Sequence, residues 1–213
     1  MQNATLATHP QTDERVPMPT PNVLILFGST YGHTERYAHW IAEDLRAHAS
    51  APQVTLSPVA EATDEMIEAA DILIVGASYL GGFLTGAPTL RKRREAMLTV
   101  PNRVFYTVSF NGTEVYPRSY LDERVMKSYK ADVAGDRPAF HFRGGLKMDE
   151  MSKLHKTALT GVKTAYKLKP KQNEYDKQLI EAFENGGADH TNREWTKPLI
   201  AEVETYLTDI AAS

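Results

Sequence analysis

The chain has 213 residues, with 24 basic and 27 acidic side chains, a formal net charge of -3 and no cysteine. This length suffices for one domain whose core needs neither disulfides nor metal. The lack of cysteine excludes thiol catalysis, disulfide exchange and cysteine-ligated zinc or iron–sulfur sites. The nearly balanced charge does not favour nucleic acid as a partner.

Residues 1–21 are rich in proline, threonine, glutamine and asparagine, and we expect them to form a disordered leader. They lack the basic and apolar regions of a secretory signal. No run in the chain approaches the ~20 apolar residues of a membrane-spanning helix. We therefore expect a cytoplasmic protein with one folded domain over residues 22–213.

Short apolar runs then alternate with helical patterns. The run Asn22–Phe27 is apolar on successive residues, which is typical of a parallel strand covered on both faces, and a helix is predicted at Thr34–Ala47. Further strands are expected at 53–56, 72–75, 104–108 and 139–142, and further helices at 64–69, 88–97, 119–129 and 194–210. This alternation predicts an α/β domain with a doubly wound sheet.

An extra helical segment, roughly residues 147–189, precedes the last helix as an insertion. A second short helix is expected inside it at 175–183. The first part of the insertion has lysines on several faces and a stripe of apolar residues at helical spacing. The residues of this stripe are Met148, Met151, Leu154, Ala158, Val162 and Ala165. One interpretation is that this stripe packs on the domain and the lysines are solvated. The other is that residues 147–171 bind an anionic lipid surface, as a peripheral membrane contact, or a substrate with carboxylates.

A loop rich in hydroxyl groups lies directly between the first strand and the first helix. Its residues are Ser29, Thr30, Tyr31, Gly32, His33 and Thr34. Backbone amides and the helix dipole at such a position favour a phosphate group, and the hydroxyls add donors. The loop contains no lysine or arginine, so we expect a neutral cradle. Neither a Walker A motif nor a dinucleotide fingerprint is present. The alternative is a simple turn capped by Thr34.

The segment FGSTYGHT (27–34) resembles the phosphate loop of the flavodoxin family, [Ser/Thr]-x-[Ser/Thr]-Gly-x-Thr, with Ser29, Gly32 and Thr34 in register. Tyr31 stands where the family usually has a serine or threonine, and Tyr-Gly-His resembles the flavodoxin-like quinone reductases instead. The resemblance implies a flavodoxin-like five-stranded parallel sheet with order 2-1-3-4-5. It also implies FMN as the cofactor, with its phosphate on this loop.

Two later loops resemble the flavin-ring loops of the same family. In such sheets the ligand lies beyond the carboxyl ends of the strands, where strand order reverses. The resemblance implies flavin contacts from Tyr79 as a stacking ring and from Phe110 or Tyr116 on the other side. An ordinary turn with a packed aromatic is the alternative for the second loop. The candidate residues are Ala77, Ser78, Tyr79, Leu80, Gly81 and Gly82, then Ser109, Phe110, Asn111, Gly112 and Tyr116.

The segments GASYLGGF, VFYTVSFN and RGGL, together with the insertion, resemble the menaquinone-dependent protoporphyrinogen dehydrogenase branch of the superfamily. That resemblance implies an FMN enzyme that oxidises a tetrapyrrole and passes electrons to a quinone. Two alternatives stay open: a flavodoxin-type electron carrier that works with a redox protein, and an NAD(P)H:quinone reductase. A net charge of -3 gives less steering than very acidic carriers have. We identify no catalytic base, and the histidine spacing favours no metal site.

Overall fold

The computed structural model describes residues 20–151 and 153–213, so the predicted leader, apart from its last two residues, lies outside them. Five parallel strands form the central sheet in the order β2-β1-β3-β5-β6, which confirms the predicted topology. The strands are β1 (Asn22–Gly28), β2 (Gln53–Pro58), β3 (Ile72–Leu80), β5 (Asn102–Ser109) and β6 (Ala139–Arg143). A two-residue strand that the sequence analysis missed, β4 (Phe83–Leu84), pairs antiparallel with the end of β3.

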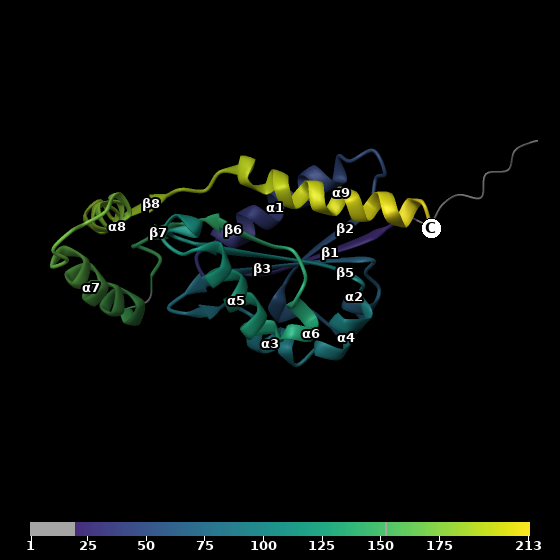
Figure 1. Cartoon of the computed structure of the whole chain (residues 1–213), viewed down its shortest axis with the longest axis horizontal. Helices are drawn as coiled ribbons and strands as arrows, with labels where there is room; N and C mark the ends of the chain where they lie inside the picture. The colour runs from purple at the N-terminus through teal and green to yellow at the C-terminus, as the bar shows by residue number, and fades with distance from the viewer. Residues whose placement is uncertain (1–19, 152) are drawn as a thin grey trace, which may run out of the picture.

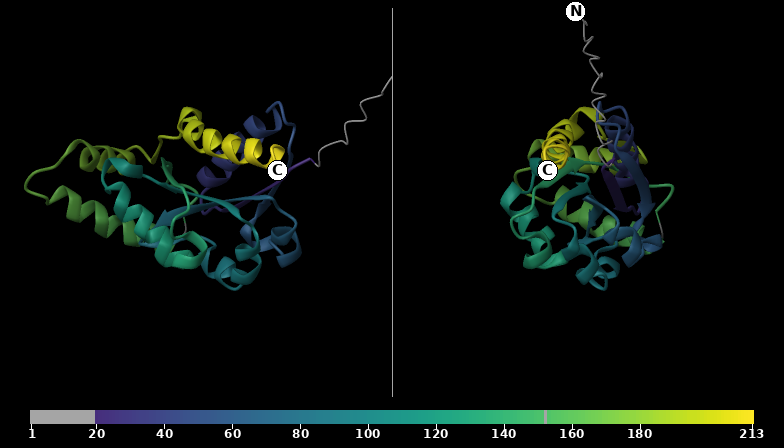
Figure 2. Two further views of the ribbon diagram at one scale, coloured as in Figure 1. Left: turned by 45° about the vertical axis from the view of Figure 1, so that its right-hand side comes forward. Right: turned by 90° about the vertical axis from the view of Figure 1, so that its right-hand side faces the viewer.

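Helices cover both faces of this sheet (Figures 1 and 2). On one face lie α1 (His33–Arg46) and α9 (Lys197–Ala211), and on the other lie α2 (Asp64–Glu68), α3 (Ala87–Arg91), α4 (Arg94–Thr99), α5 (Arg118–Tyr129) and α6 (Ala131–Ala134). Short 3-10 turns are η1 (Val59–Glu61), η2 (Gly112–Glu114) and η3 (Arg193–Thr196). Successive β1 residues enter opposite core clusters, Ile25 beside α1 and Leu26 beside the other helices. Burial on both faces explains the uninterrupted apolar run.

The helix predicted at 88–97 is two short helices, α3 and α4. A tight turn separates them, in which the Arg93 amide donates to the Leu90 carbonyl at 2.9 Å instead of continuing the helical ladder. Leu90, Ala96 and Met97 still bury their side chains in one cluster. The apolar spacing is therefore preserved across the break, which is why the periodicity suggested a single helix.

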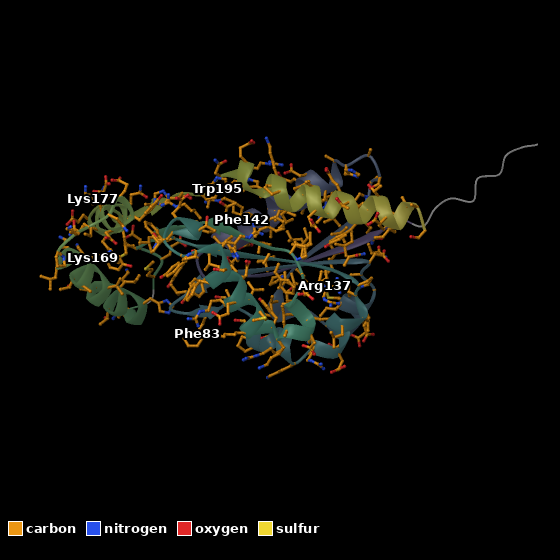
Figure 3. The ribbon with its side chains drawn as sticks, in the orientation of Figure 1. Phe83, Arg137, Phe142, Lys169, Lys177 and Trp195 are labelled. Carbon is orange, nitrogen blue, oxygen red and sulfur yellow. The ribbon has the colours of Figure 1, made fainter. Side chains whose placement is uncertain are left out.

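The insertion begins and ends in a small two-stranded sheet, in which β7 (Gly145–Lys147) pairs antiparallel with β8 (Gly187–Asp189). Between these strands lie α7 (Lys153–Lys167) and α8 (Glu174–Glu184), which project beyond one end of the central sheet. In Figure 3, Lys169 and Lys177 lie at the far end of this projection, away from Trp195 and Phe142. A capping box of Asn173 and Asp176 starts α8.

The apolar stripe predicted for the insertion does not form one packed face. Since α7 begins at Lys153, Met148 and Met151 precede it, and Val162 and Ala165 are exposed. The side chains of Leu154 and Ala158 lie outside the described ones. The packed face of α7 carries Leu159 and Tyr166, which join Tyr31, Phe110 and Phe183 in a separate cluster. Contacts with aromatic rings on the loops and on α8 thus bury a side of α7 other than the one that the apolar spacing predicted.

Candidate functional site

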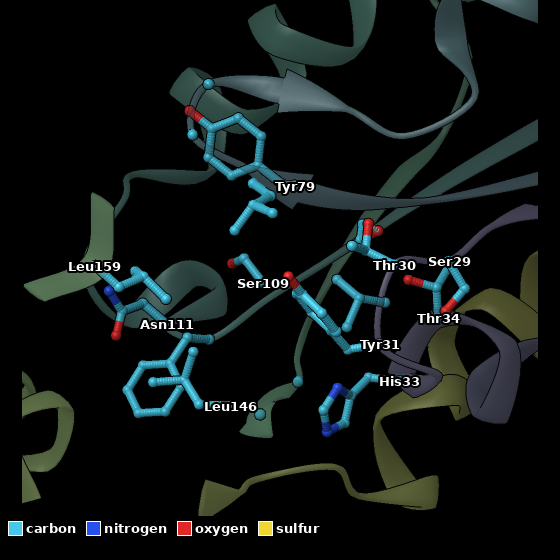
Figure 4. A pocket seen from close by; sticks show the side chains of 18 of the residues that line it. Ser29, Thr30, Tyr31, His33, Thr34, Tyr79, Ser109, Asn111, Leu146 and Leu159 are labelled. Atoms are coloured by element: carbon cyan, nitrogen blue, oxygen red, sulfur yellow. Dashed lines mark hydrogen bonds between the residues drawn. The ribbon is translucent and has the colours of Figure 1, made fainter. Parts of the chain in front are cut away.

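A cavity of about 380 Å³ opens at the carboxyl ends of β1, β3 and β5 (Figure 4). Ser29 and Thr34 lie at one end of it, and Tyr79, Asn111 and Leu159 lie at the other, with Tyr31 between. Its walls come from the loops after these three strands and from the insertion. The described residues lining it are Ser29, Thr30, Tyr31, His33, Thr34, Ser78, Tyr79, Leu80, Gly81, Gly82, Val108, Ser109, Phe110, Asn111, Tyr116, Tyr120, Gly144, Gly145, Leu146, Met151, Leu159 and Leu179.

The loop after β1 opens the amino end of α1 toward this cavity. Gly32 precedes the helix with φ 83°, a left-handed conformation that favours glycine. No side chain caps the helix, so the amides of its first turn have neither an intrahelical nor a side-chain acceptor. Open amides and the positive end of the helix dipole are what an anionic group requires.

The loop hydroxyls play different roles. Ser29 Oγ accepts a hydrogen bond from the Gly32 amide at 3.0 Å, which shapes the turn. Thr30 Oγ1 lies 3.0 Å from Ser78 Oγ and 3.0 Å from Thr85 Oγ1, which ties the loop to the end of β3. Thr34 Oγ1, by contrast, is buried without a hydrogen-bond partner. An unsatisfied buried hydroxyl costs about 1–3 kcal/mol, so Thr34 is the side chain of this loop best suited to meet a ligand.

A cation does approach the loop from the insertion. A Cβ placed on Gly32 would lie 3.5 Å from Lys147 Nζ, and this ammonium pairs with Glu150 at 3.1 Å. The pKa of His33 is lowered, first by burial and also by Arg36 and Lys147, while Asp189 and Glu150 oppose the change. The cradle expected to be neutral from its own residues thus has a compensated ion pair beside it, and His33 stays uncharged at neutral pH.

A cluster of tyrosines lies at the opposite end of the cavity. The hydroxyls of Tyr79 and Tyr120 are 3.1 Å apart, and the rings of Tyr116 and Tyr120 stack with centroids 5.3 Å apart. Burial and the hydrogen bond with Tyr120 raise the pKa of Tyr79 to about 12. The Arg124 guanidinium lies over the Tyr120 ring at 4.7 Å and donates to its hydroxyl at 2.8 Å. Tyr79 is therefore neutral, and the contacts with Tyr120 hold the rings in place.

The loop after β5 presents one unsatisfied acceptor. Asn111 Oδ1 is buried without a hydrogen-bond partner, and the Gly112 amide donates to Ser109 Oγ at 3.0 Å. The Phe110 ring lies with its centroid 5.0 Å from that of His190, and the Arg143 guanidinium donates to the Phe110 carbonyl at 3.2 Å. Phe110 is thus held against the insertion, whereas the Asn111 amide group is available at the cavity wall.

The insertion supplies an apolar wall, which the sequence analysis missed. Leu146, Met151, Leu159 and Leu179 come from β7, the turn after it, α7 and α8. Tyr31 contacts the same wall, because its hydroxyl shares a hydrogen bond with Nδ1 of His155 on α7. Among the described lining residues there is no Asp, Glu, Lys or Arg. The site is consequently an uncharged cavity, with the hydroxyls and amides of the loop after β1 at one end and with tyrosine rings, Asn111 and apolar side chains toward the other.

Most of the predicted site residues meet at this cavity. Gly32 and Gly112 belong to the loops after β1 and β5, and Ala77 lies within β3, which extends beyond the strand predicted at 72–75. None of the three lines the cavity: Gly32 lies beside Lys147, Ala77 is buried in the core, and Gly112 packs on Arg143. Missed lining residues are Val108, Tyr120, Gly144, Gly145, Leu146, Met151, Leu159 and Leu179. Proximity to RGGL could have suggested residues 144–146, but those from α7 and α8 required the packing of the insertion.

Within residues 20–151 and 153–213, no group of histidine and acidic side chains could hold a metal ion. Likewise, no described helix combines the length and the apolar character needed to cross a bilayer.

Comparison with known proteins points to one family. Residues 24–176 match the family model described as a flavodoxin domain. No curated protein sequence matches the chain. Neither finding identifies the protoporphyrinogen dehydrogenase branch or a specific oxidase or reductase.

Solved structures similar to this chain include flavodoxins from three bacteria. A single-residue mutant of the Pseudomonas aeruginosa flavodoxin is 17% identical with a TM-score of 0.43, and the match covers 66% of this chain and 93% of that one. The two-electron reduced Megasphaera elsdenii flavodoxin is 13% identical with a TM-score of 0.41, covering 55% and 80%. The Streptococcus pneumonia TIGR4 flavodoxin is 20% identical with a TM-score of 0.38, covering 55% and 82%.

Proposed function

The chain belongs to the flavodoxin domain family, with FMN as its cofactor, and we propose that it is an oxidoreductase whose redox partner is an uncharged ring compound of the quinone class. Bound FMN supplies a centre that accepts and donates one or two electrons. The observation that carries the proposal is that the apolar wall of the insertion and the loops after β1, β3 and β5 line one cavity.

The residues at the hydroxyl end fit the phosphate of FMN. The unpartnered Thr34 hydroxyl and the open amides of the first turn of α1 provide donors. Ser29 and Thr30 keep the loop in shape through their own hydrogen bonds, and the nearby Lys147 is paired with Glu150. A phosphate with roughly two negative charges would satisfy donors that otherwise lack partners.

Side chains near the other end would orient the flavin ring. The Asn111 amide group has an unused buried oxygen, which can accept from a ring N–H group. Tyr79 and Tyr116 offer rings whose positions are held by Tyr120. We propose further contacts to the flavin from the ends of β3 and β5 and the loops after them, which contain Ser78, Leu80, Gly81, Gly82, Ser109 and Phe110.

The uncharged lining favours a quinone over a tetrapyrrole with carboxylate side chains. A carboxylate in a cavity needs a cation or several donors, because burying it unpaired is costly. The lysines of the insertion do not line this cavity, and Lys147 is paired with Glu150. Leu146, Met151, Leu159 and Leu179 instead match an apolar ring. The same reasoning disfavours a phosphate-bearing nicotinamide cofactor at the apolar end.

The insertion also separates this proposal from the carrier hypothesis. A carrier exchanges electrons with another protein, for which an accessible flavin edge is useful. Here the insertion and Tyr31 cover one side of the cavity, which favours a small molecule over a protein as the redox partner. We therefore place direct exchange with a redox protein second.

The experiment uses the FMN-loaded full chain, reduced by light without oxygen. Mixing with menadione should reoxidise it within seconds as two electrons and two protons pass to the quinone. A reaction with a carboxylate-bearing porphyrinogen but none with menadione would overturn the proposal in favour of the tetrapyrrole enzyme. Rapid bleaching by NAD(P)H would favour the nicotinamide-dependent reductase. Reoxidation only by a redox protein would favour the carrier.

Matched variants on α7 test where the quinone binds. Leu159→Glu places a charge in the apolar wall and should slow reoxidation by menadione at least tenfold, while Val162→Glu changes the exposed face of the same helix and should not. Bound FMN per chain, measured by absorbance, and circular dichroism check that both variants load and fold. If Leu159→Glu fails to fold, Leu159→Ala replaces it in the same test, and Leu159→Ala should weaken the apparent affinity for menadione.

A further inference from the structure

We propose that the outward face of α7 binds an anionic lipid surface. This inference does not depend on the cofactor or on the redox partner, because it concerns the side of the helix that faces away from the cavity. It rests on the exposure of that face, on the charge around it and on its position in the fold.

The side of α7 opposite Leu159 and Tyr166 is exposed and carries small and apolar residues together with the threonines Thr157, Thr160 and Thr164. Gly161 and Ala165 are exposed, Val162 is 38% exposed, and Leu168, just after the helix, is 76% exposed. A Cβ placed on Gly161 would meet no atom within 4 Å. Leu159 and Tyr166, which lie on a different side of the helix, supply the internal packing instead. The exposed apolar side chains are therefore not needed for the core of the insertion.

Lysines lie along one flank of this face and near its carboxyl end. Between residues 151 and 173 the sequence contains no Asp or Glu but has Lys153, Lys156, Lys163, Lys167, Lys169 and Lys171. Lys167 pairs with Glu184 and Lys169 pairs with Asp176 of α8. Among the described residues no carboxylate forms an ion pair with Lys156 or Lys163, and both lysines are half-buried. Lys163 nevertheless lies close enough to Glu184 that, after Lys167, it also lowers the pKa of that carboxyl. A chain with a net charge of -3 thus concentrates positive charge on one projecting helix.

These features favour a lipid surface over a second copy of the chain. An amphipathic helix with lysines beside an apolar strip is the pattern of interfacial helices on anionic membranes. The helix projects beyond the sheet domain, so a flat surface can reach it (Figure 2). Two copies joined through this face would instead bring their lysines together, and like charges repel.

The position of α7 connects this surface with the cavity. Leu159 lines the cavity from one side of the helix, Leu168 lies exposed on the opposite side just after its end, and Val162 lies between the two. A helix with its side chains is about 10 Å across. A bound membrane would therefore lie roughly one helix diameter from the cavity, a useful place for a partner dissolved in lipid.

The test is flotation of the full chain with vesicles of phosphatidylcholine alone or with one quarter phosphatidylglycerol. The chain should float with the anionic vesicles at least tenfold more than with neutral ones, and 0.5 M NaCl should reduce flotation. The double variants Val162→Glu/Leu168→Glu and Lys156→Gln/Lys163→Gln should each lower flotation severalfold. No preference for anionic vesicles would overturn the proposal.

Controls separate this surface from general charge effects. Thr205→Glu adds a negative charge on an exposed position of α9, and Arg91→Gln/Lys92→Gln removes two positive charges from the exposed end of α3. Both should float like the unchanged chain, and equal loss in these controls would contradict a specific α7 surface. Sedimentation without vesicles gives the oligomeric state. A dimer that Leu168→Glu converts to a monomer would overturn the proposal in favour of self-association.

Discussion

The Tyr31 hydroxyl, in the loop after β1, shares a hydrogen bond with Nδ1 of His155 on α7. Burial raises the pKa of Tyr31, so the phenol stays protonated and can donate to the imidazole. The loop proposed to hold the FMN phosphate therefore also holds the insertion.

Replacing Tyr31 with phenylalanine should loosen α7 while leaving the sheet intact. A net hydrogen bond contributes about 0.5–1.5 kcal/mol, so amide hydrogen exchange in residues 153–167 should be roughly two- to tenfold faster. Mass spectrometry of the exchanged peptides measures this. Tyr175→Phe is the matched control, because its hydroxyl bonds to Glu114 and not to α7. Equal exchange in Tyr31→Phe and the unchanged chain would show that the bond does not stabilise α7.

Replacing Thr34 with valine should separate cofactor affinity from stability. The Thr34 hydroxyl has no partner within the described residues, so the FMN-free variant should be as stable as the unchanged chain or slightly more stable. Its Kd for FMN should rise about five- to tenfold, the equivalent of one lost hydrogen bond. Fluorescence titration and urea unfolding measure the two quantities. Unchanged affinity would mean that Thr34 does not contact the ligand.

Ser29→Ala offers a contrast to Thr34→Val. Ser29 Oγ already accepts from the Gly32 amide, so its loss should weaken both the loop and FMN binding. We expect a lower urea midpoint for the FMN-free variant, unlike Thr34→Val. The same stability for both variants would contradict the division of roles between these hydroxyls.

Buried His141 should make stability fall in mild acid. Its ring bonds to Thr107 Oγ1 at 2.8 Å and to Asp122 Oδ1 at 2.9 Å, and burial lowers its pKa, although Asp122 opposes the change. Since the unfolded chain has the higher pKa, about 6.5, it binds more protons below that pH. The contribution of the neutral His141 ring to the free energy of unfolding is therefore complete above about pH 6.5. It is lost as the pH falls through the pKa of His141 in the folded chain.

Urea unfolding between pH 5 and pH 8 measures this dependence. His141→Gln should flatten the curve, whereas exposed His39→Gln should leave its slope unchanged. The lowered pKa values of His33 and His190 act in the same direction, so some slope should remain in His141→Gln. A slope identical to that of the unchanged chain would exclude His141 as a contributor.

Two glycine-to-alanine changes should have opposite effects. A Cβ on Gly28 would lie 2.0 Å from the Thr85 carbonyl oxygen, so Gly28→Ala must displace backbone at the end of β1 and should destabilise the chain by several kcal/mol. Gly161, in the middle of α7, has open space around it, and Gly161→Ala should stabilise that helix by about 0.5–1 kcal/mol. Thermal unfolding and hydrogen exchange measure both. A neutral Gly28→Ala would contradict the close approach.

The order of the sheet and the loops of the site could be predicted from particular residues. The run Asn22–Phe27 has side chains buried on both faces, so its composition already indicated a covered parallel strand. Because parallel strands place their carboxyl ends at one edge, Thr34, Tyr79 and Asn111 were expected at a common site although they are far apart in sequence. The structure brings all three to one cavity.

The roles of individual hydroxyls could not be predicted, because Ser29, Thr30 and Thr34 differ only in their partners. Thr30 finds Ser78 and Thr85, and Thr34 finds none, which depends on how β1 and β3 approach. The orientation of α7 was also beyond the local pattern. The helix α7 has apolar residues on more than one side, and the contacts of Tyr166 and Leu159 decide which side packs against the cavity.

What the sequence by itself determined is the local and periodic part of this protein: buried strands, a glycine and hydroxyl loop before α1, and an insertion rich in lysine. These follow from backbone preference and from the period at which apolar residues recur. Only the tertiary structure decided that the insertion lines the cavity, that Lys147 lies beside Gly32, and that the apolar residues Val162 and Leu168 face outward. The reason is physical: such contacts depend on the packing of distant side chains, and periodicity carries no information about which distant surface a helix will meet.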